Sequence, residues 1–405
     1  MAILGINAVA DRSSACSISA TGVITAELLN DSAYPESTVD ALYSSYESWD
    51  AIATVPHAAN EVRSRFKRNV EVVDYCDAIA MATIASTNWT HCAVLLSDAE
   101  HTRLGYFADG SFHWIRTFDY PNSIALFSSA ATRFLGFDAI SGEDRAREIS
   151  RRGNPVYAPW ISRHIVTQEP GSYTLLHNLE RGAGIGSCDA NIATSVQSVF
   201  TSVLVNLATW LRKHVDSNKL AIVGRSAANY LTNSAIANAS GYEHIAAISV
   251  NGAPAISLGA AALISRPILE HSYIGIRKES QQSAEQVAEL LLRGDIVTHI
   301  STNEFSNNSF INRNRLTIPY EPRLNGLKDS TTYAVCQDRD YSTYFSGKHL
   351  PYFGQYISTV INRKAINYEY ARVITVGKNK NSFINRVLEI TRAQGYPILV
   401  SSPIT

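Results

Sequence analysis

Cysteine and histidine are the residue types best suited to metal binding and covalent chemistry, and their spacing here predicts neither. The five cysteines form no Cys-x-x-Cys pair and no disulfide ladder; they are Cys16, Cys76, Cys92, Cys188 and Cys336. The histidines in the first third of the chain lack metal-ligand spacing; they are His57, His91, His101 and His113. We therefore expect buried thiols in a reducing cytosol and ordinary polar histidines.

Four polar or small residues stand where a strand or helix could present them to a ligand. Asp98 closely follows the apolar segment 92–96, and Gly224 directly follows the apolar segment 219–223. Asn229 and Asn233 lie one helical turn apart just beyond Gly224. Each also has a purely structural interpretation, because an aspartate at a strand end caps turns and asparagines satisfy nearby backbone groups.

The composition, 45% hydrophobic and 18% charged residues, is that of an ordinary soluble globular protein. The formal net charge of -1 and the pI near 6.8 give no electrostatic reason to expect nucleic acid or an anionic membrane as partner. No run of about 20 apolar residues is present, so we expect no membrane span. The N-terminus lacks a basic region of the signal-peptide kind, so we expect a cytoplasmic protein.

The elements that position these residues begin with a β-meander. Apolar segments predict strands over 2–9, 15–19 and 23–29, which is how actin-like nucleotide-binding folds open. Further along, we expect helices near 37–47, 57–68 and 76–86, a strand over 92–96, and a hairpin of strands 104–107 and 112–118 that turns at Asp109-Gly110.

Alternating helices and strands follow, which favours a layered α/β domain. The predicted elements are a helix over 191–214, a strand over 219–223, a strand over 245–250 and a helix over 254–263. Arg266-Pro267 marks the predicted domain boundary, giving domains 1–265 and 266–405.

The second predicted domain is less regular. Its predicted elements are a helix over 283–293, a strand over 296–300, an Asn- and Ser-rich loop over 303–314, a strand over 371–376, a helix over 383–394 and a strand over 397–400. Residues 336–368 have no clear periodicity and receive no assignment.

Three segments share one spacing: Thr132-Arg-Phe-Leu-Gly-Phe137, Ser141-Gly-Glu143 and Gly153-Asn-Pro-Val-Tyr157. Together they resemble the TRFLGF…SGEYKVMGLAPYG block of one family, the O-carbamoyltransferases of antibiotic and nodulation-factor biosynthesis. The opening Ile3-Leu-Gly-Ile-Asn7 and the segment from Tyr370 to Ser401 also resemble family segments. The resemblance covers most of the chain in order and spacing, at weak identity.

The resemblance implies a fold and a reaction. The implied fold is α/β: an actin-like, ribonuclease-H-type domain over 1–265, shared with threonylcarbamoyl transferases, and a shortened YrdC-like domain over 266–405. The implied chemistry makes carbamoyl adenylate from carbamoyl phosphate and ATP, then passes the carbamoyl group to a substrate hydroxyl. The implied cofactors of an active enzyme are ATP and a divalent metal, iron or magnesium.

Most of the family's metal ligands are replaced in this sequence. Tyr75 and Ile79 occupy the two histidine positions of the family's HHLAHA motif, and isoleucine cannot bind a metal. Ala253 stands where the resemblance places a carboxylate, so Asp98 is the single surviving ligand position. A single carboxylate does not hold a divalent ion in water, so we expect no metal there.

The implied nucleotide site is also altered. Its remaining positions are Gly224, Arg225, Asn229, Asn233, Gly252 and Gly259. Arg225 stands where the family has a second glycine that lets the backbone approach the nucleotide, and Ile256 replaces another nucleotide-facing glycine. In the second domain Asn308 replaces the arginine that would bind carbamoyl phosphate, while Asn312 and Arg313 survive as catalytic remnants.

These replacements favour a pseudoenzyme, a carbamoyltransferase fold kept for binding or assembly, with no cofactor. Its expected partner is a protein, such as an active carbamoyltransferase or a larger assembly, or a second copy of the chain. The alternative is an active ATP-dependent O-carbamoyltransferase with a rearranged site built on Asp98, Arg225, Asn229 and Arg313. A generic actin-like kinase fits less well, since its phosphate loops would not be intact. Members of the resembling family usually continue past the segment that Leu399-Val400-Ser401 matches, whereas this sequence ends at Thr405, so we expect the closing elements to be missing or to come from another subunit.

Overall fold

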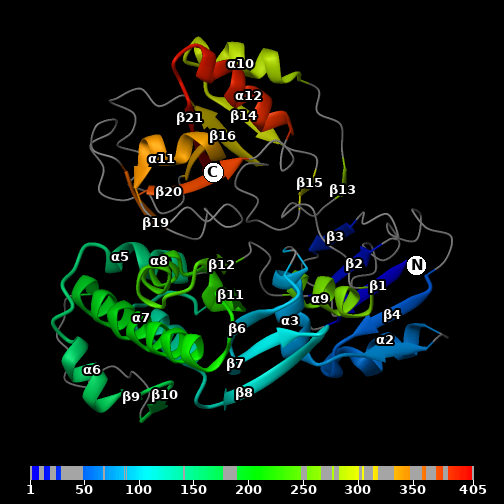
Figure 1. Ribbon diagram of the computed structural model, residues 1–405, viewed down its shortest axis with the longest axis vertical. Coiled ribbons are helices and arrows are strands. Elements are labelled where there is room, and N and C mark those ends of the chain that lie inside the picture. Colours follow the sequence, from blue (N-terminus) through cyan, green and yellow to red (C-terminus); the bar gives the residue numbers. More distant parts are fainter. Residues whose placement is uncertain are drawn as a thin grey trace. The chain divides into compact units, whose positions relative to one another are not determined.

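Two compact units make up the protein, and each is built around β-sheets (Figure 1). Unit 1 comprises Met1–Trp89 and Ala246–Thr405, and unit 2 comprises Thr90–Ile245. The computed structural model describes residues 2–8, 13–18, 24–28, 49–66, 69–85, 87, 89–139, 142–176, 189–247, 253–265, 276–277, 282–300, 303–304, 313–317, 333–346, 358–361, 371–376 and 382–403. The predicted domain boundary at 265/266 borders residues outside this part, as do the predicted helix 37–47, Gly252, Asn308 and Asn312, so these stay predictions.

The first sheet of unit 1 has five strands in the order β3-β2-β1-β4-β5. The strands are β1 (Ile3–Asn7), β2 (Ser14–Ile18), β3 (Ile24–Leu28), β4 (Ala51–Thr54) and β5 (Val70–Val72). The first three pair antiparallel as a meander, whereas β4 runs parallel to β1 and β5 parallel to β4. The predicted opening meander is confirmed.

The apolar helix α9 (Ala253–Ser265) packs on this sheet, and a second apolar helix, α3 (Tyr75–Ile84), packs against α9. Figure 1 shows α9, in yellow-green, next to α3 and the blue strands, although it comes from much later in the chain. The close approach depends on glycine, because a Cβ at Gly259 would fall on the carbonyl oxygen of Ala78 in α3. The predicted helix over 57–68 is divided into a 3-10 turn, η1 (Pro56–Ala58), and α2 (Ala59–Arg65).

Unit 2 repeats the topology of that sheet. Its five strands run in the order β12-β11-β6-β7-β8, with β6, β7 and β8 antiparallel and β11 parallel to β6. They are β6 (Cys92–Ser97), β7 (His101–Ala108), β8 (Ser111–Asp119), β11 (Lys219–Val223) and β12 (His244–Ala246). A meander followed by strands added on the other side of its first strand occurs in both units. This duplication is the actin-like, ribonuclease-H-type fold that was predicted.

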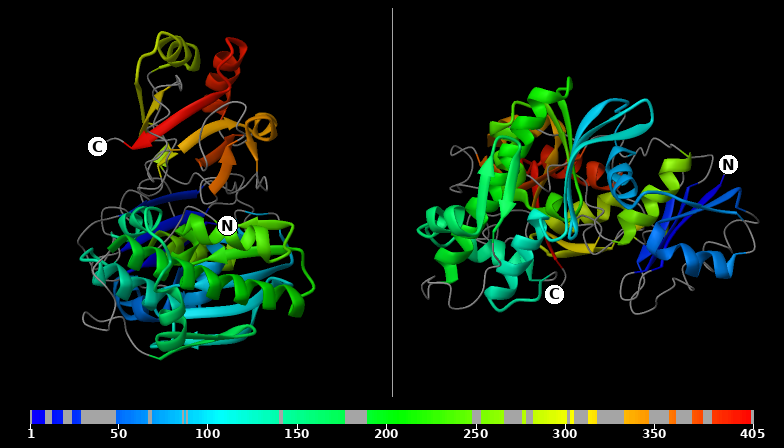
Figure 2. Two further views of the ribbon diagram at one scale, coloured as in Figure 1. Left: turned by 90° about the vertical axis from the view of Figure 1, so that its left-hand side faces the viewer. Right: turned by 90° about the horizontal axis from the view of Figure 1, so that it is seen from below.

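The helices of unit 2 gather around one long central helix, α7 (Asp189–His214), seen in green in both views of Figure 2. The others are α4 (Ile124–Phe134), α5 (Glu143–Ser150), α6 (Ala158–His164), η2 (Arg225–Ala228) and α8 (Tyr230–Ala239). A small hairpin of β9 (Val166–Glu169) and β10 (Ser172–Leu175) completes the unit. By length and composition α7 could cross a membrane, but 56% of its most apolar window is buried, as in a core helix.

A third, seven-stranded sheet belongs to unit 1 and has the order β14-β16-β21-β17-β20-β19-β18. Its strands are β14 (Val297–Ile300), β16 (Arg313–Thr317), β17 (Tyr333–Gln337), β18 (Phe345–Ser346), β19 (Ser358–Ile361), β20 (Ala371–Val376) and β21 (Ile398–Pro403). Shorter elements are β13 (Ile276–Arg277), β15 (Asn303–Glu304), η4 (Asp338–Asp340) and α11 (Tyr341–Tyr344). Its resemblance to a YrdC-like domain remains a prediction.

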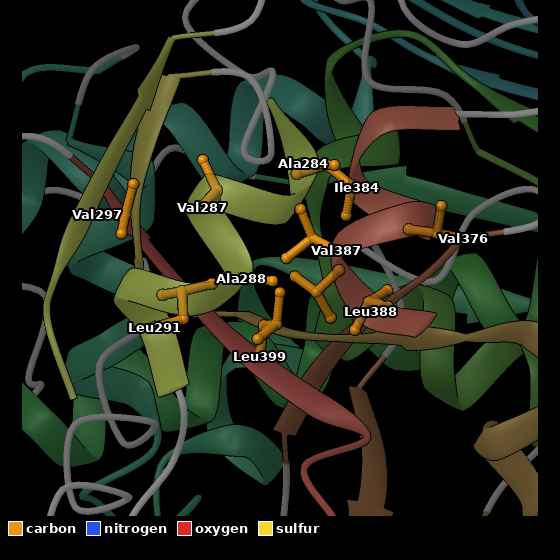
Figure 3. Packing of buried hydrophobic residues seen from close by; sticks show 11 residues of the cluster. Ala284, Val287, Ala288, Leu291, Val297, Val376, Ile384, Val387, Leu388 and Leu399 are labelled. Atoms are coloured by element: carbon orange, nitrogen blue, oxygen red, sulfur yellow. The ribbon is translucent and has the colours of Figure 1, made fainter. Parts of the chain in front are cut away.

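Alternation along the strands gives this sheet two apolar faces. Val335 and Leu399 belong to a core cluster with α10 (Ala284–Leu292) and α12 (Ser382–Ala393), whose side chains meet in Figure 3. Their neighbours Cys336 and Ile398 belong to a second cluster with Tyr341 and Phe345. Successive side chains of a strand point to opposite faces, so one short apolar run supplies both cores.

The second domain departs from the sequence interpretation in two places. The predicted Asn- and Ser-rich loop over 303–314 holds β15 and the start of β16. The unassigned segment 336–368 holds the end of β17, η4, α11, β18 and β19. Short strands at a sheet edge have little periodicity of their own, because pairing partners rather than local pattern determine them.

Candidate functional site

The candidate site of unit 2 lies at the carboxyl ends of the parallel strands β6 and β11. Val223 of β11 is paired in register with Leu96 of β6, so Asp98 and Gly224 come at neighbouring strand ends. In open α/β sheets this edge is where ligands commonly bind. The structure therefore brings together two residues that lie far apart in the sequence.

Gly224 makes the close approach of the two strand ends feasible. Its φ of 83° lies in the left-handed region that side-chain-bearing residues avoid. A Cβ built on Gly224 would lie 2.6 Å from the carbonyl oxygen of Ser97 and 3.2 Å from the Cβ of Asp98. Ser97 and Ser226 tighten the same junction through a hydrogen bond of 2.8 Å between their Oγ atoms.

Asp98 is largely buried, with 8% of its surface exposed. Its Oδ1 accepts a hydrogen bond of 3.3 Å from the backbone N–H of Arg225. Its carbonyl oxygen accepts a hydrogen bond of 2.7 Å from the Oγ of Ser123, next to α4. The Asp98 carboxylate thus caps the turn after β11. Capping a turn is the structural role that the sequence offered as the alternative to metal binding.

Arg225 turns its guanidinium toward the protein. Its Nη2 lies 2.7 Å from Oε1 of Glu143 and also donates to the carbonyl oxygen of Ala139. The side chains of Arg225 and Glu143 are only 17% and 13% exposed. The guanidinium of Arg225 is therefore already bound to an internal carboxylate.

Glu143 begins α5, and it is the acidic residue of the Ser-Gly-Glu block. Burial raises the pKa of its carboxyl above the ordinary value, and the charges of Arg225 and Arg147 lower it only in part. Buried ion pairs commonly show this balance, in which the cost of desolvation exceeds the attraction between the charges.

Asn229 and Asn233 serve the helix that follows. Asn229 is the N-cap of α8: its side-chain oxygen accepts from the backbone N–H of Thr232 at 3.1 Å. Its Nδ2 also donates to Oε1 of Gln197 in α7 at 3.0 Å, so it joins two helices. Asn233 is fully buried, and its Nδ2 donates to the carbonyl oxygen of Ala227 at 2.8 Å.

The remaining predicted positions lie elsewhere in the fold. Gly259 packs α9 against α3 within unit 1, where Ile256 is also buried. Tyr75 begins α3, and Ile79 is buried within it. Arg313 is the first residue of β16 and pairs opposite Ile300 of β14.

A polar cluster in unit 1 was not foreseen from the sequence. It lies at the carboxyl ends of the parallel strands β1 and β4. Nε2 of His57 lies 3.1 Å from Oδ1 of the buried Asn7, and the His57 ring lies 5.6 Å from that of Tyr75. No group of three or more potential metal-binding side chains of histidine, cysteine, aspartate or glutamate occurs within the described residues.

Comparison with known proteins identifies no family. No protein-family model and no curated protein matches the sequence. Among solved structures, component A of (R)-2-hydroxyglutaryl-CoA dehydratase from Acidaminococcus fermentans is 12% identical, covering 65% of this chain and 97% of that one, with a TM-score of 0.39. A ROK family glucokinase from Streptomyces griseus, solved with glucose and AMPPNP, is 12% identical over 65% and 99% of the two chains, with a TM-score of 0.34. A ROK hexokinase from Thermus thermophilus is 14% identical over 65% and 98%, with a TM-score of 0.36. At these values the three proteins say nothing about this chain's chemistry.

Proposed function

We propose that this actin-like protein is a degenerate relative of the O-carbamoyltransferases that acts as a binding or assembly subunit rather than as a transferase. The observation that carries the proposal is the ion pair of Arg225 with Glu143. The arginine stands at a position where the resembling family needs a bare backbone. Its positive charge is directed to an internal carboxylate rather than to a phosphate.

The neighbouring groups support the same proposal. The carboxylate of Asp98 accepts the backbone N–H of Arg225, and Asn229 caps α8 and binds Gln197. Each remnant of the implied nucleotide site in unit 2 thus has a structural partner. A ligand that needed these groups would have to displace existing hydrogen bonds, which lowers its affinity.

The proposed partner is a protein: an active carbamoyltransferase, a larger assembly, or a second copy of this chain. The polar groups at the strand ends are bound to one another, so they are not available to a small ligand. The folded chain still offers its outer surface to another protein. Sedimentation of the purified chain, alone and with an active carbamoyltransferase, measures this directly. A single monomeric species in both samples would contradict an assembly role.

One observation favours the alternative, an active transferase with a rearranged site. Asp98 and Gly224 remain neighbours at the carboxyl edge of a parallel strand pair, where α/β proteins bind ligands. In that case ATP and a divalent metal would be the cofactors.

The experiment is an assay of pyrophosphate release from ATP in the presence of carbamoyl phosphate, with magnesium and with iron(II). The proposal predicts release no faster than in the Arg225→Ala chain or without protein. Turnover by the wild-type chain that is lost in the Asp98→Ala chain would overturn it in favour of the transferase.

A further inference from the structure

We draw no further inference here: the strongest candidate, the apolar edge strand β8 of the unit 2 sheet, has no buried residue and no partner strand on its outer side within the described part of the chain, and nothing in the structure shows what covers it.

Discussion

The guanidinium of Arg225 and the carboxylate of Glu143 lie 2.7 Å apart, and both are largely shielded from water. The pair links the turn after β11 to the start of α5 within unit 2. Because burial of a charge is costly, each partner depends on the other to remain ionised inside the protein. The consequences can be measured without knowing any ligand.

Removing one member of the pair should cost more than removing both. Arg225→Met or Glu143→Met alone leaves a buried charge and should destabilise the chain by about 3–5 kcal/mol. The double variant should recover most of this loss, because two apolar side chains replace a desolvated pair. Urea unfolding of the four chains, followed by tryptophan fluorescence, measures the differences.

The exposed pair Arg293–Glu289 is the matched control, with both side chains 64% exposed. Arg293→Met should change stability by no more than about 0.5 kcal/mol. Additive losses in the double Arg225 and Glu143 variant would show that the two residues act independently, against this account.

The raised pKa of Glu143 predicts a pH dependence with a definite sign. A carboxyl whose folded pKa exceeds its unfolded value of about 4.3 stabilises the fold fully below that value and loses this contribution as pH rises through the folded pKa. Relative to Glu143→Gln, the wild-type chain should therefore become less stable as the pH rises above about 4.3. Urea midpoints of both chains across that range test this. If the wild-type chain instead gains stability over Glu143→Gln as the pH rises, the charges of Arg225 and Arg147 lower the pKa of Glu143 by more than burial raises it.

Gly224 should tolerate alanine worse than a glycine with the same backbone and open space. Gly136 has a φ of 85° and would place a Cβ where nothing lies within 4 Å. Gly136→Ala should cost about 1 kcal/mol for backbone strain. Gly224→Ala should cost at least twice that, because its Cβ also meets the Ser97 carbonyl. If Gly224→Ala and Gly136→Ala lose equal amounts of unfolding free energy, the close approach of β6 and β11 does not depend on Gly224.

The buried thiols should resist alkylation. Cys16, Cys76, Cys92 and Cys336 are buried thiols that form no disulfide, and burial raises the pKa of Cys92 to about 12. Below that pKa the thiolate fraction rises tenfold per pH unit, so alkylation of Cys92 should still be accelerating at pH 10. Peptide mapping after iodoacetamide treatment follows each thiol, with the urea-unfolded chain as control. A rate at Cys92 that levels off near pH 8.5 would contradict its burial.

The sequence predicted much of the fold where apolar patterns are long. The strand over 219–223 coincides with β11, and the predicted helix over 191–214 differs from α7 only at its first turn. The opening meander was enough to suggest an actin-like topology. The sequence did not show that unit 1 is built from two separate segments, Met1–Trp89 and Ala246–Thr405. Its helices α3 and α9 come from different segments, and their contact at Gly259 has no counterpart in a local sequence pattern.

The candidate site was predicted in its positions and not in its interactions. Asp98, Gly224, Arg225 and Asn229 do lie together. Nothing in the sequence links Arg225 with Glu143, since no periodicity relates residues on separate elements. The contact of His57 with Asn7 escaped for the same reason, as two parallel strands bring them together.

Calorimetric titration of ATP into the purified chain, with magnesium and with iron(II), tests the central claim most directly. The account predicts no heat of binding at millimolar nucleotide and no rise in melting temperature, because Arg225, Asp98 and Asn229 already bind partners within the protein. Saturable binding by the wild-type chain that disappears in Asp98→Ala or Asn229→Ala would contradict it and identify a working nucleotide site.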